Sequence, residues 1–260
     1  MTDWNGAEYA TLSGLQRTMI TEAMAGLDFR PDDHVLDIGC GDGFLTAAIA
    51  ALVPRGLVVG ADPSHRMVAT AAGSAAAGDV DPRFVVADVR ALPFGETFDA
   101  AVSFNALHWV PEVRLALSQI AAVLKPGGSL LVQVVCAGTR PSLEGVTTTL
   151  SRQPRWVRWF EDLDPPFVHV DPDGYAALAA SAGLVLDDLV ATDRTWDFGS
   201  REAFHRWSAM GSTAWTDRLP AEHRERFVTE QVDAYEQVTG TAGLFAFMQM
   251  RARLHRGQTG

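Results

Sequence analysis

Short apolar runs alternate with longer segments of helical periodicity over the first half of the chain. The apolar runs lie at 34–38, 56–62, 83–87, 98–103 and 129–135. Runs of this length without a polar face are typical of buried parallel strands. Residues 44–53 and 112–123 carry apolar side chains on one helical face, and Ser64 is a suitable N-cap for a further helix. Strands that alternate with helices predict an α/β fold with a doubly wound, mostly parallel sheet.

The second half of the chain predicts additions to this core. Residues 175–182 predict a helix that ends at Gly183, and residues 184–190 predict a sixth strand. Apolar and polar positions alternate with a period of two over 244–254, which predicts the last strand. We therefore expect one domain, 1–260, with an N-terminal helical lid and two helical cap insertions, at 1–30, 137–172 and 200–240.

The connection between the first strand and the first helix is rich in glycine. Residues 37–43 have the sequence DIGCGDG. Glycine permits a sharp turn and lets a ligand approach the main chain, and the following helix directs free N–H groups to the same place. A dinucleotide-binding turn has its third glycine three residues after the second, but here Gly43 follows Gly41 by two. The turn therefore indicates a nucleotide-like ligand of another kind, or a tight connection without a ligand.

Polar side chains follow the neighbouring strands where each one ends. Asp62 ends the second strand, Asp88 follows the third, and Asn105 follows the fourth. Because the carboxyl ends of parallel strands meet at one edge of a sheet, we expect these side chains beside the glycine turn. The two carboxylate oxygens of Asp62 are suited to accept hydrogen bonds from both hydroxyl groups of a ribose.

These residues together resemble the class I S-adenosylmethionine-dependent methyltransferases, over roughly residues 30–136. The glycine turn matches the first motif of that family and Asp62 matches its ribose-binding acid. Further motifs follow in the family's order at 87–89, 92–94, 98–99 and 124–128. The resemblance implies a seven-stranded Rossmann-like sheet with an antiparallel last strand, and S-adenosyl-L-methionine as the cofactor.

The resemblance also implies which residues hold that cofactor. The N-terminal segment would lie over it, with Tyr9 and Gln16 near its methionine carboxylate; Met67 would contact the adenine, or belong to the core. The full set of implied cofactor residues is Tyr9, Gln16, Asp37, Gly39, Cys40, Gly41, Gly43, Asp62, Pro63, Met67, Asp88, Val89, Phe104 and Asn105.

The acceptor is expected beyond the fourth strand, beneath the caps. His108 is the candidate catalytic residue: it is suited to act as a general base on a hydroxyl, or to donate a hydrogen bond to a carboxylate that attacks already ionised. It could instead only anchor its loop. Trp109, Trp156 and Trp159 are the candidate acceptor-binding residues. The alternative is that Trp156 and Trp159 form small cores within the cap and that Trp109 is structural. The segments around Tyr9, Gln16 and 107–110 resemble the small-molecule carboxyl methyltransferases of the trans-aconitate and juvenile-hormone-acid types, which implies methyl transfer to oxygen.

Composition favours a small-molecule substrate. The net charge is −11 and no run of Lys or Arg is present, which argues against a partner with a phosphate backbone. The two cysteines, Cys40 and Cys136, have no metal-ligand spacing and predict no disulfide framework, and no basic leader or membrane-length apolar run occurs. We expect a cytoplasmic protein without a metal, a nucleic-acid partner or membrane insertion; its oligomeric state stays open.

Two other classes of function share parts of this pattern. A nicotinamide-dependent oxidoreductase has a similar strand–turn–helix start, although the glycine spacing argues against it. A protein that binds S-adenosylmethionine without turnover would keep the core and lack a working acceptor site. N- or C-methylation of a metabolite is the alternative within the methyltransferase class.

Overall fold

A computed structural model describes residues 14–24, 26–75 and 81–257 of the 260-residue chain. At its centre lies a seven-stranded sheet with the strand order β3-β2-β1-β4-β5-β7-β6. The strands are β1 His34–Ile38, β2 Leu57–Asp62, β3 Arg83–Val86, β4 Phe98–Phe104, β5 Leu124–Val135, β6 Leu184–Asp197 and β7 Leu244–Arg256. The first five pair in parallel, and β7 runs antiparallel to both β5 and β6. The predicted sheet, with its antiparallel last strand, is confirmed.

The strand order reverses at β1, which lies between β2 and β4. The helix that follows β1 and the helix that follows β4 lie on opposite faces of the sheet. A crevice therefore opens beyond the carboxyl end of β1, where ligands bind in open α/β sheets. The glycine turn follows β1 directly, and Asp62 ends the neighbouring strand β2. The topology therefore brings the predicted polar residues to one edge.

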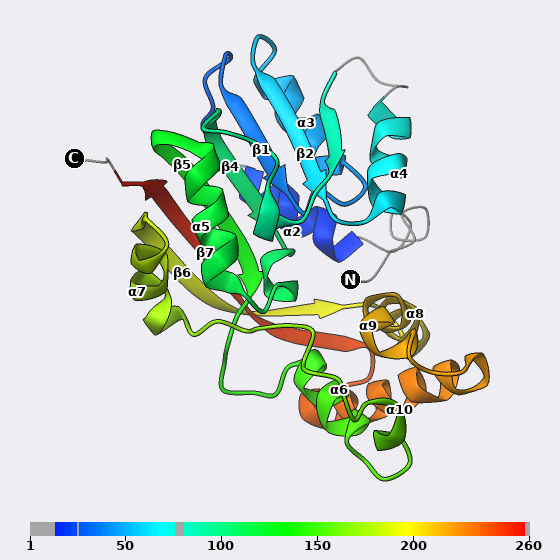
Figure 1. Cartoon of the computed structure of the whole chain (residues 1–260). Helices are drawn as coiled ribbons and strands as arrows, with labels where there is room; N and C mark the ends of the chain where they lie inside the picture. Colours follow the sequence, from blue (N-terminus) through cyan, green and yellow to red (C-terminus); the bar gives the residue numbers. More distant parts are fainter. Residues whose placement is uncertain (1–13, 25, 76–80, 258–260) are drawn as a thin grey trace.

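Helices cover both faces of the sheet because neighbouring residues of a strand point to opposite sides. Val35 packs with Leu45 and Ile49 of α3, and the next residue, Leu36, packs with Leu117 of α5 on the other face. The helices of this part are α2 Gly14–Met24, α3 Phe44–Leu52, α4 His65–Ala75, α5 Val113–Val123 and α7 Tyr175–Ser181 (Figure 1). The helices predicted over 44–53, 112–123 and 175–182 are present within one residue of their expected bounds, whereas the helix of the predicted lid already ends at Met24.

Two helix boundaries follow the expected chemistry. The Ser64 hydroxyl accepts a hydrogen bond from the Met67 N–H at 3.2 Å, which makes Ser64 the N-cap of α4. Gly183 has a φ of +83°, a left-handed conformation that ends α7 and that glycine adopts without steric cost.

The sixth strand is longer than the apolar pattern predicts. It continues from Leu184 past residue 190 to Asp197, paired along its length with β7. Its second half is largely exposed, so it lacks the apolar alternation from which a strand is recognised. This long hairpin extends away from the other strands and carries the cap (Figure 1).

The cap is built from helices of two separate segments. α6 Leu143–Ser151 comes from the segment after β5, whereas α8 Arg201–Gly211, α9 Thr213–Thr216 and α10 Ala221–Thr239 come from the connection between β6 and β7. Helix α10 is fixed to the hairpin by the Tyr235 hydroxyl, which donates to the Ala246 carbonyl at 2.5 Å and accepts from its N–H at 3.2 Å. Short 3-10 turns complete the fold: η1 Val89–Ala91, η2 Leu107–Trp109, η3 Val157–Trp159 and η4 Pro172–Gly174. Within the described residues, no helix is long and apolar enough to cross a membrane.

Candidate functional site

The glycine turn adopts a backbone that only glycine accommodates readily. Gly39, Gly41 and Gly43 have φ values of +72°, +54° and +81°. A side chain on Gly39 would place its Cβ 2.2 Å from the Cβ of Ala106, whereas a Cβ on Gly41 would meet nothing within 4 Å. Gly39 and Gly41 both line the main cavity described below. The turn therefore presents bare main chain to a ligand.

Asp62 organises the turn from the next strand. Its Oδ2 accepts from the Gly41 N–H at 3.0 Å and its Oδ1 accepts from the Ser64 N–H at 2.8 Å. One carboxylate thus fixes both the glycine turn and the entry to α4, and it also lines the main cavity.

Asp37 and Cys40 lie on the other side of the turn. Asp37 is buried and accepts from the Thr46 hydroxyl at 2.6 Å; burial raises the pKa of this carboxyl to about 7. Burial and nearby acids also raise the pKa of the Cys40 thiol. Both residues line a separate small cavity of about 40 Å³, which Arg17 of α2 borders as well.

Asp88 is held by the arginine two residues later. Its carboxylate accepts from the Arg90 guanidinium at 2.6 Å and from the Arg90 N–H at 2.8 Å, which caps η1. The hydrogen bonds from Arg90 keep the pKa of Asp88 below its usual range. Asp88 and Val89 both line the main cavity described below, at the end of β3, and Arg90 holds the Asp88 side chain in place.

Asn105 has the strained backbone typical of functional positions. It is the only non-glycine residue among those described with a positive φ, 55°. Its N–H donates to the Gln133 carbonyl at 2.7 Å, but both polar atoms of its side chain are buried without a hydrogen-bond partner among the described residues. Buried amides normally have partners, so the Asn105 side chain is a candidate for contact with a ligand.

His108 is a second buried polar residue, and one of its ring nitrogens has no hydrogen-bond partner among the described residues. It lies on η2, directly after β4, and its Nδ1 makes no hydrogen bond to the described residues. Burial and, to a smaller extent, the nearby His169 lower the pKa of His108 to about 3. The ring is therefore uncharged at neutral pH.

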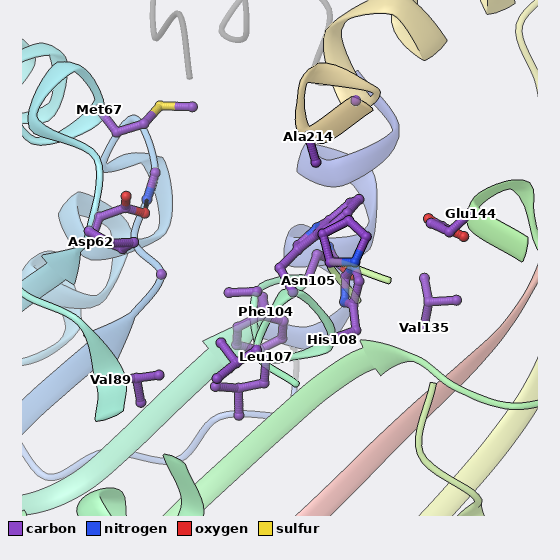
Figure 2. Close-up of a pocket in the computed structure, with 18 of the residues that line it drawn as sticks. Asp62, Met67, Val89, Phe104, Asn105, Leu107, His108, Val135, Glu144 and Ala214 are labelled. Carbon is purple, nitrogen blue, oxygen red and sulfur yellow. Dashed lines mark hydrogen bonds between the residues drawn. The ribbon is translucent and has the colours of Figure 1, made fainter. Parts of the chain in front are cut away.

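Apart from Asp37, Cys40 and Gly43, the residues described above as site candidates border one cavity of about 430 Å³ between the sheet edge and the cap. Figure 2 shows Asp62 and Met67 on one side of it, Glu144 on the other, and His108 between them. Asp62 and Met67 belong to the end beside the glycine turn, and the far end is bordered by residues such as Trp207 of the cap and Phe245 of β7. The arrangement can hold a polar nucleoside at one end and a mainly apolar molecule at the other.

Comparisons with known proteins agree with this geometry. Residues 35–128 match the family model described as Methyltransferase domain. The chain is 28% identical to the trans-aconitate 2-methyltransferase of Variovorax paradoxus, over 96% of this chain and 97% of that protein. It is 25% identical to the putative methyltransferase 235L of Invertebrate iridescent virus 6, over 93% and 88%.

The domain match, the relatives and the fold together support a class I S-adenosylmethionine-dependent methyltransferase. Solved structures share its fold. YcgJ from Bacillus subtilis superposes with a TM-score of 0.67 at 21% identity, covering 94% of this chain and all of that one. A phosphoethanolamine N-methyltransferase from Haemonchus contortus, solved with S-adenosyl-L-methionine, superposes with a TM-score of 0.63 at 15% identity, covering 99% and 58%.

S-adenosyl-L-methionine is the cofactor of this methyltransferase, and the bare glycine main chain beside Asp62 fits it. The main cavity brings together most of the residues predicted to contact it: Gly39, Gly41, Asp62, Pro63, Met67, Asp88, Val89, Phe104 and Asn105. Asp37 and Cys40 border the small cavity instead, and Gly43 borders neither, because it packs against Ala71 and Phe84. Tyr9 lies outside the described residues, as does the side chain of Gln16.

The acceptor end requires one correction. His108 and Trp109 line the cavity as predicted, but Trp156 and Trp159 do not. Trp156 is buried in a separate core within the cap, where its indole N–H donates to Glu230 at 2.8 Å, and the Arg158 guanidinium covers Trp159. These aromatic rings complete the cap rather than the methyltransferase pocket. The tryptophans on the cavity wall are Trp109, Trp207 and Trp215.

Four polar cap residues on the cavity wall were not predicted: Glu144, Thr147, Ser212 and Gln231. Glu144 of α6 lines the cavity, and so does Gln231 of α10, whose amide N–H donates to the Thr147 hydroxyl at 2.6 Å while its oxygen accepts from Ser212 at 2.8 Å. These two hydrogen bonds of Gln231 connect α10 to α6 and to Ser212 at the start of α9. A single polar residue inside an amphipathic helix carries no sequence signal of this role.

Proposed function

We propose that this methyltransferase transfers the methyl group of S-adenosyl-L-methionine to a carboxylate oxygen of a small molecule. The observation that carries the proposal is His108, a buried, uncharged ring with an unpartnered nitrogen, on the cavity wall between the cofactor end and the cap. The relatives named trans-aconitate 2-methyltransferase, which align along nearly the whole chain, support a carboxylate acceptor.

The cofactor supplies an electrophilic methyl group on a sulfonium. The protein therefore has to bind the cofactor and the acceptor, orient them toward each other, and exclude water. We assign Asp62 to the ribose, the main chain at Gly39 and Gly41 to the methionine part, and Asp88 with Val89 to the adenine edge. We also assign Asn105 to the polar methionine end, because its amide borders both cavities and has no hydrogen-bond partner among the described residues.

The lowered pKa of His108 favours a carboxylate over a hydroxyl. A general base works best when its pKa is near the operating pH, and a value of about 3 makes this imidazole a weak base at neutral pH. A carboxylic acid has a pKa of about 4 and is already ionised. We therefore assign His108 the role of donating a hydrogen bond to one acceptor oxygen while the other oxygen attacks.

A matched pair of acceptors tests this assignment. Octanoate and octanol have the same chain and differ in the reacting group, and trans-aconitate is included because the relatives are named for it. We expect methyl octanoate as product, no ether from octanol, and a rate that varies little between pH 6 and 9. Methylation of octanol alone, with a rate that rises with pH, would instead favour a hydroxyl acceptor with His108 as the base.

The cofactor assignment has its own control. Asp62→Ala should weaken the binding of S-adenosylhomocysteine by roughly 1.5–3 kcal/mol, the range for hydrogen bonds to a charged group. Calorimetric titration measures this directly. Unchanged affinity would remove the ribose assignment, and tight cofactor binding without turnover of any acceptor would favour a protein that only binds the cofactor.

A further inference from the structure

In the part of the chain that the structure describes, the wall of the main cavity is acidic and offers an acceptor no cation that is free of an ion pair. Among the described residues, Asp62, Asp88 and Glu144 line it together with one arginine, Arg90. The Arg90 guanidinium already binds Asp88 at 2.6 Å and Glu112 at 3.0 Å. No lysine, arginine or histidine occurs in the stretches that the structure leaves undescribed, which are 1–13, 25, 76–80 and 258–260.

Glu144 is the acidic group at the acceptor end. It is 9% exposed, and its Oε2 is buried without a hydrogen-bond partner among the described residues. The nearest basic group is the Nε2 of His169 at 3.6 Å, but burial lowers the pKa of His169, so this ring is uncharged at neutral pH. Arg140 is paired with Asp193 and does not belong to the cavity wall.

The number of carboxylates that such a cavity can hold follows from charge compensation. An ionised carboxylate removed from water needs a cation or several donors, because uncompensated burial is strongly unfavourable. The reacting carboxylate of the acceptor lies beside the cofactor's sulfonium, which compensates its charge. A second carboxylate on the same acceptor would reach the acceptor end of the cavity. The side chains there are mainly apolar, such as Val135, Met210 and Phe245, and the acidic group among them is Glu144.

We propose that Glu144 sets the charge selectivity of the acceptor site, so that the enzyme takes apolar monocarboxylates and rejects acceptors with a second carboxylate. This inference rests on the proposed function, because it needs the reacting group to be the one carboxylate that the cofactor compensates. Such a charge selectivity would distinguish this protein from an enzyme whose acceptor is a tricarboxylate, because that enzyme would require cations at this end of the cavity.

The test compares octanoate with octanedioate, which has the same length and a carboxylate at each end. Each is titrated by calorimetry into protein saturated with sinefungin, a cofactor analogue that carries an ammonium in place of the methylsulfonium. We expect octanoate to bind at least roughly 30-fold more tightly than octanedioate. Glu144→Gln, which keeps the shape and adds a donor, should reduce this ratio by roughly 5-fold or more.

Two further variants make the result specific. Glu161→Gln removes an exposed acid of the cap that is not on the cavity wall, and it should leave the ratio unchanged. Glu144→Asp keeps the acid and should preserve the discrimination, and it serves as the test if Glu144→Gln fails to fold. Thermal unfolding of each variant identifies such a failure.

The outcomes separate this inference from the proposed function. Equal affinity for the two ligands, no binding of octanoate, or a ratio that Glu144→Gln leaves unchanged would overturn the role of Glu144. If octanoate binds selectively but is not methylated when S-adenosyl-L-methionine replaces the analogue, charge selectivity stands and carboxylate methylation fails.

Discussion

Replacing Gly39 by alanine should be far more damaging than the same change two residues later. Both positions have a positive φ, which costs alanine roughly 1–2 kcal/mol. At Gly41 this is the whole cost, because the added Cβ meets nothing within 4 Å. At Gly39 the new Cβ would lie 2.2 Å from that of Ala106. Carbon atoms in contact are about 3.5 Å or more apart, so the two segments must separate by about 1.3 Å, and such overpacking costs about 1–3 kcal/mol.

A double-mutant cycle isolates the second contribution. Gly39→Ala should lower the free energy of unfolding by about 2–5 kcal/mol, and Gly41→Ala by about 1–2 kcal/mol, as measured by urea denaturation. Ala106→Gly removes the opposing Cβ, so Gly39→Ala combined with Ala106→Gly should recover about 1–3 kcal/mol relative to the sum of the single changes. A coupling energy within about 0.5 kcal/mol of zero would refute the contact between the turn and η2.

Two further predictions concern His108 and the tryptophans. Because the pKa of His108 is about 3 when folded and about 6.5 when unfolded, the unfolded state binds more protons between these pH values, and stability falls as the pH drops below about 6.5. Between pH 7.5 and 5 the loss from this residue should be about 2 kcal/mol, so His108→Gln should flatten the pH dependence of urea unfolding by that amount. The exposed His65 provides the control, since His65→Gln should keep the wild-type dependence, and equal curves for His108→Gln and wild type would contradict the burial of His108. Trp156→Phe should lower stability by about 2 kcal/mol through loss of the bond to Glu230, with acceptor KM unchanged, whereas Trp207→Phe should change that KM. A large rise in acceptor KM for Trp156→Phe at wild-type stability would return Trp156 to the pocket.

The cofactor half of the site could be predicted because its signals are local. The glycine turn, Asp62 and Asp88 each follow an apolar run, and parallel strands bring their ends together whatever the rest of the chain does. Ser64 and Gly183 fixed helix boundaries for the same reason, since each acts through its own backbone neighbours.

The acceptor half depends on tertiary packing, which the sequence pattern does not resolve. The cap is rich in tryptophan, and composition alone does not distinguish Trp156, which fills a core, from Trp207, which borders the cavity. Glu144 resembles an ordinary surface acid until α6 packs against α10 and buries it. The second half of β6 lacks an apolar face, so its length follows only from its pairing with β7.

The long hairpin has a consequence for how such an enzyme can acquire new substrates. Asp197 and Leu244 are paired neighbours, so the 46 residues between them, 198–243, leave and re-enter the sheet at one place. This single excursion contributes Trp207, Met210 and Gln231 to the acceptor end, whereas the cofactor contacts come from the first half of the chain. A change of acceptor therefore involves this excursion together with α6, to which Gln231 is hydrogen-bonded through Thr147, and it need not alter the residues assigned to the cofactor.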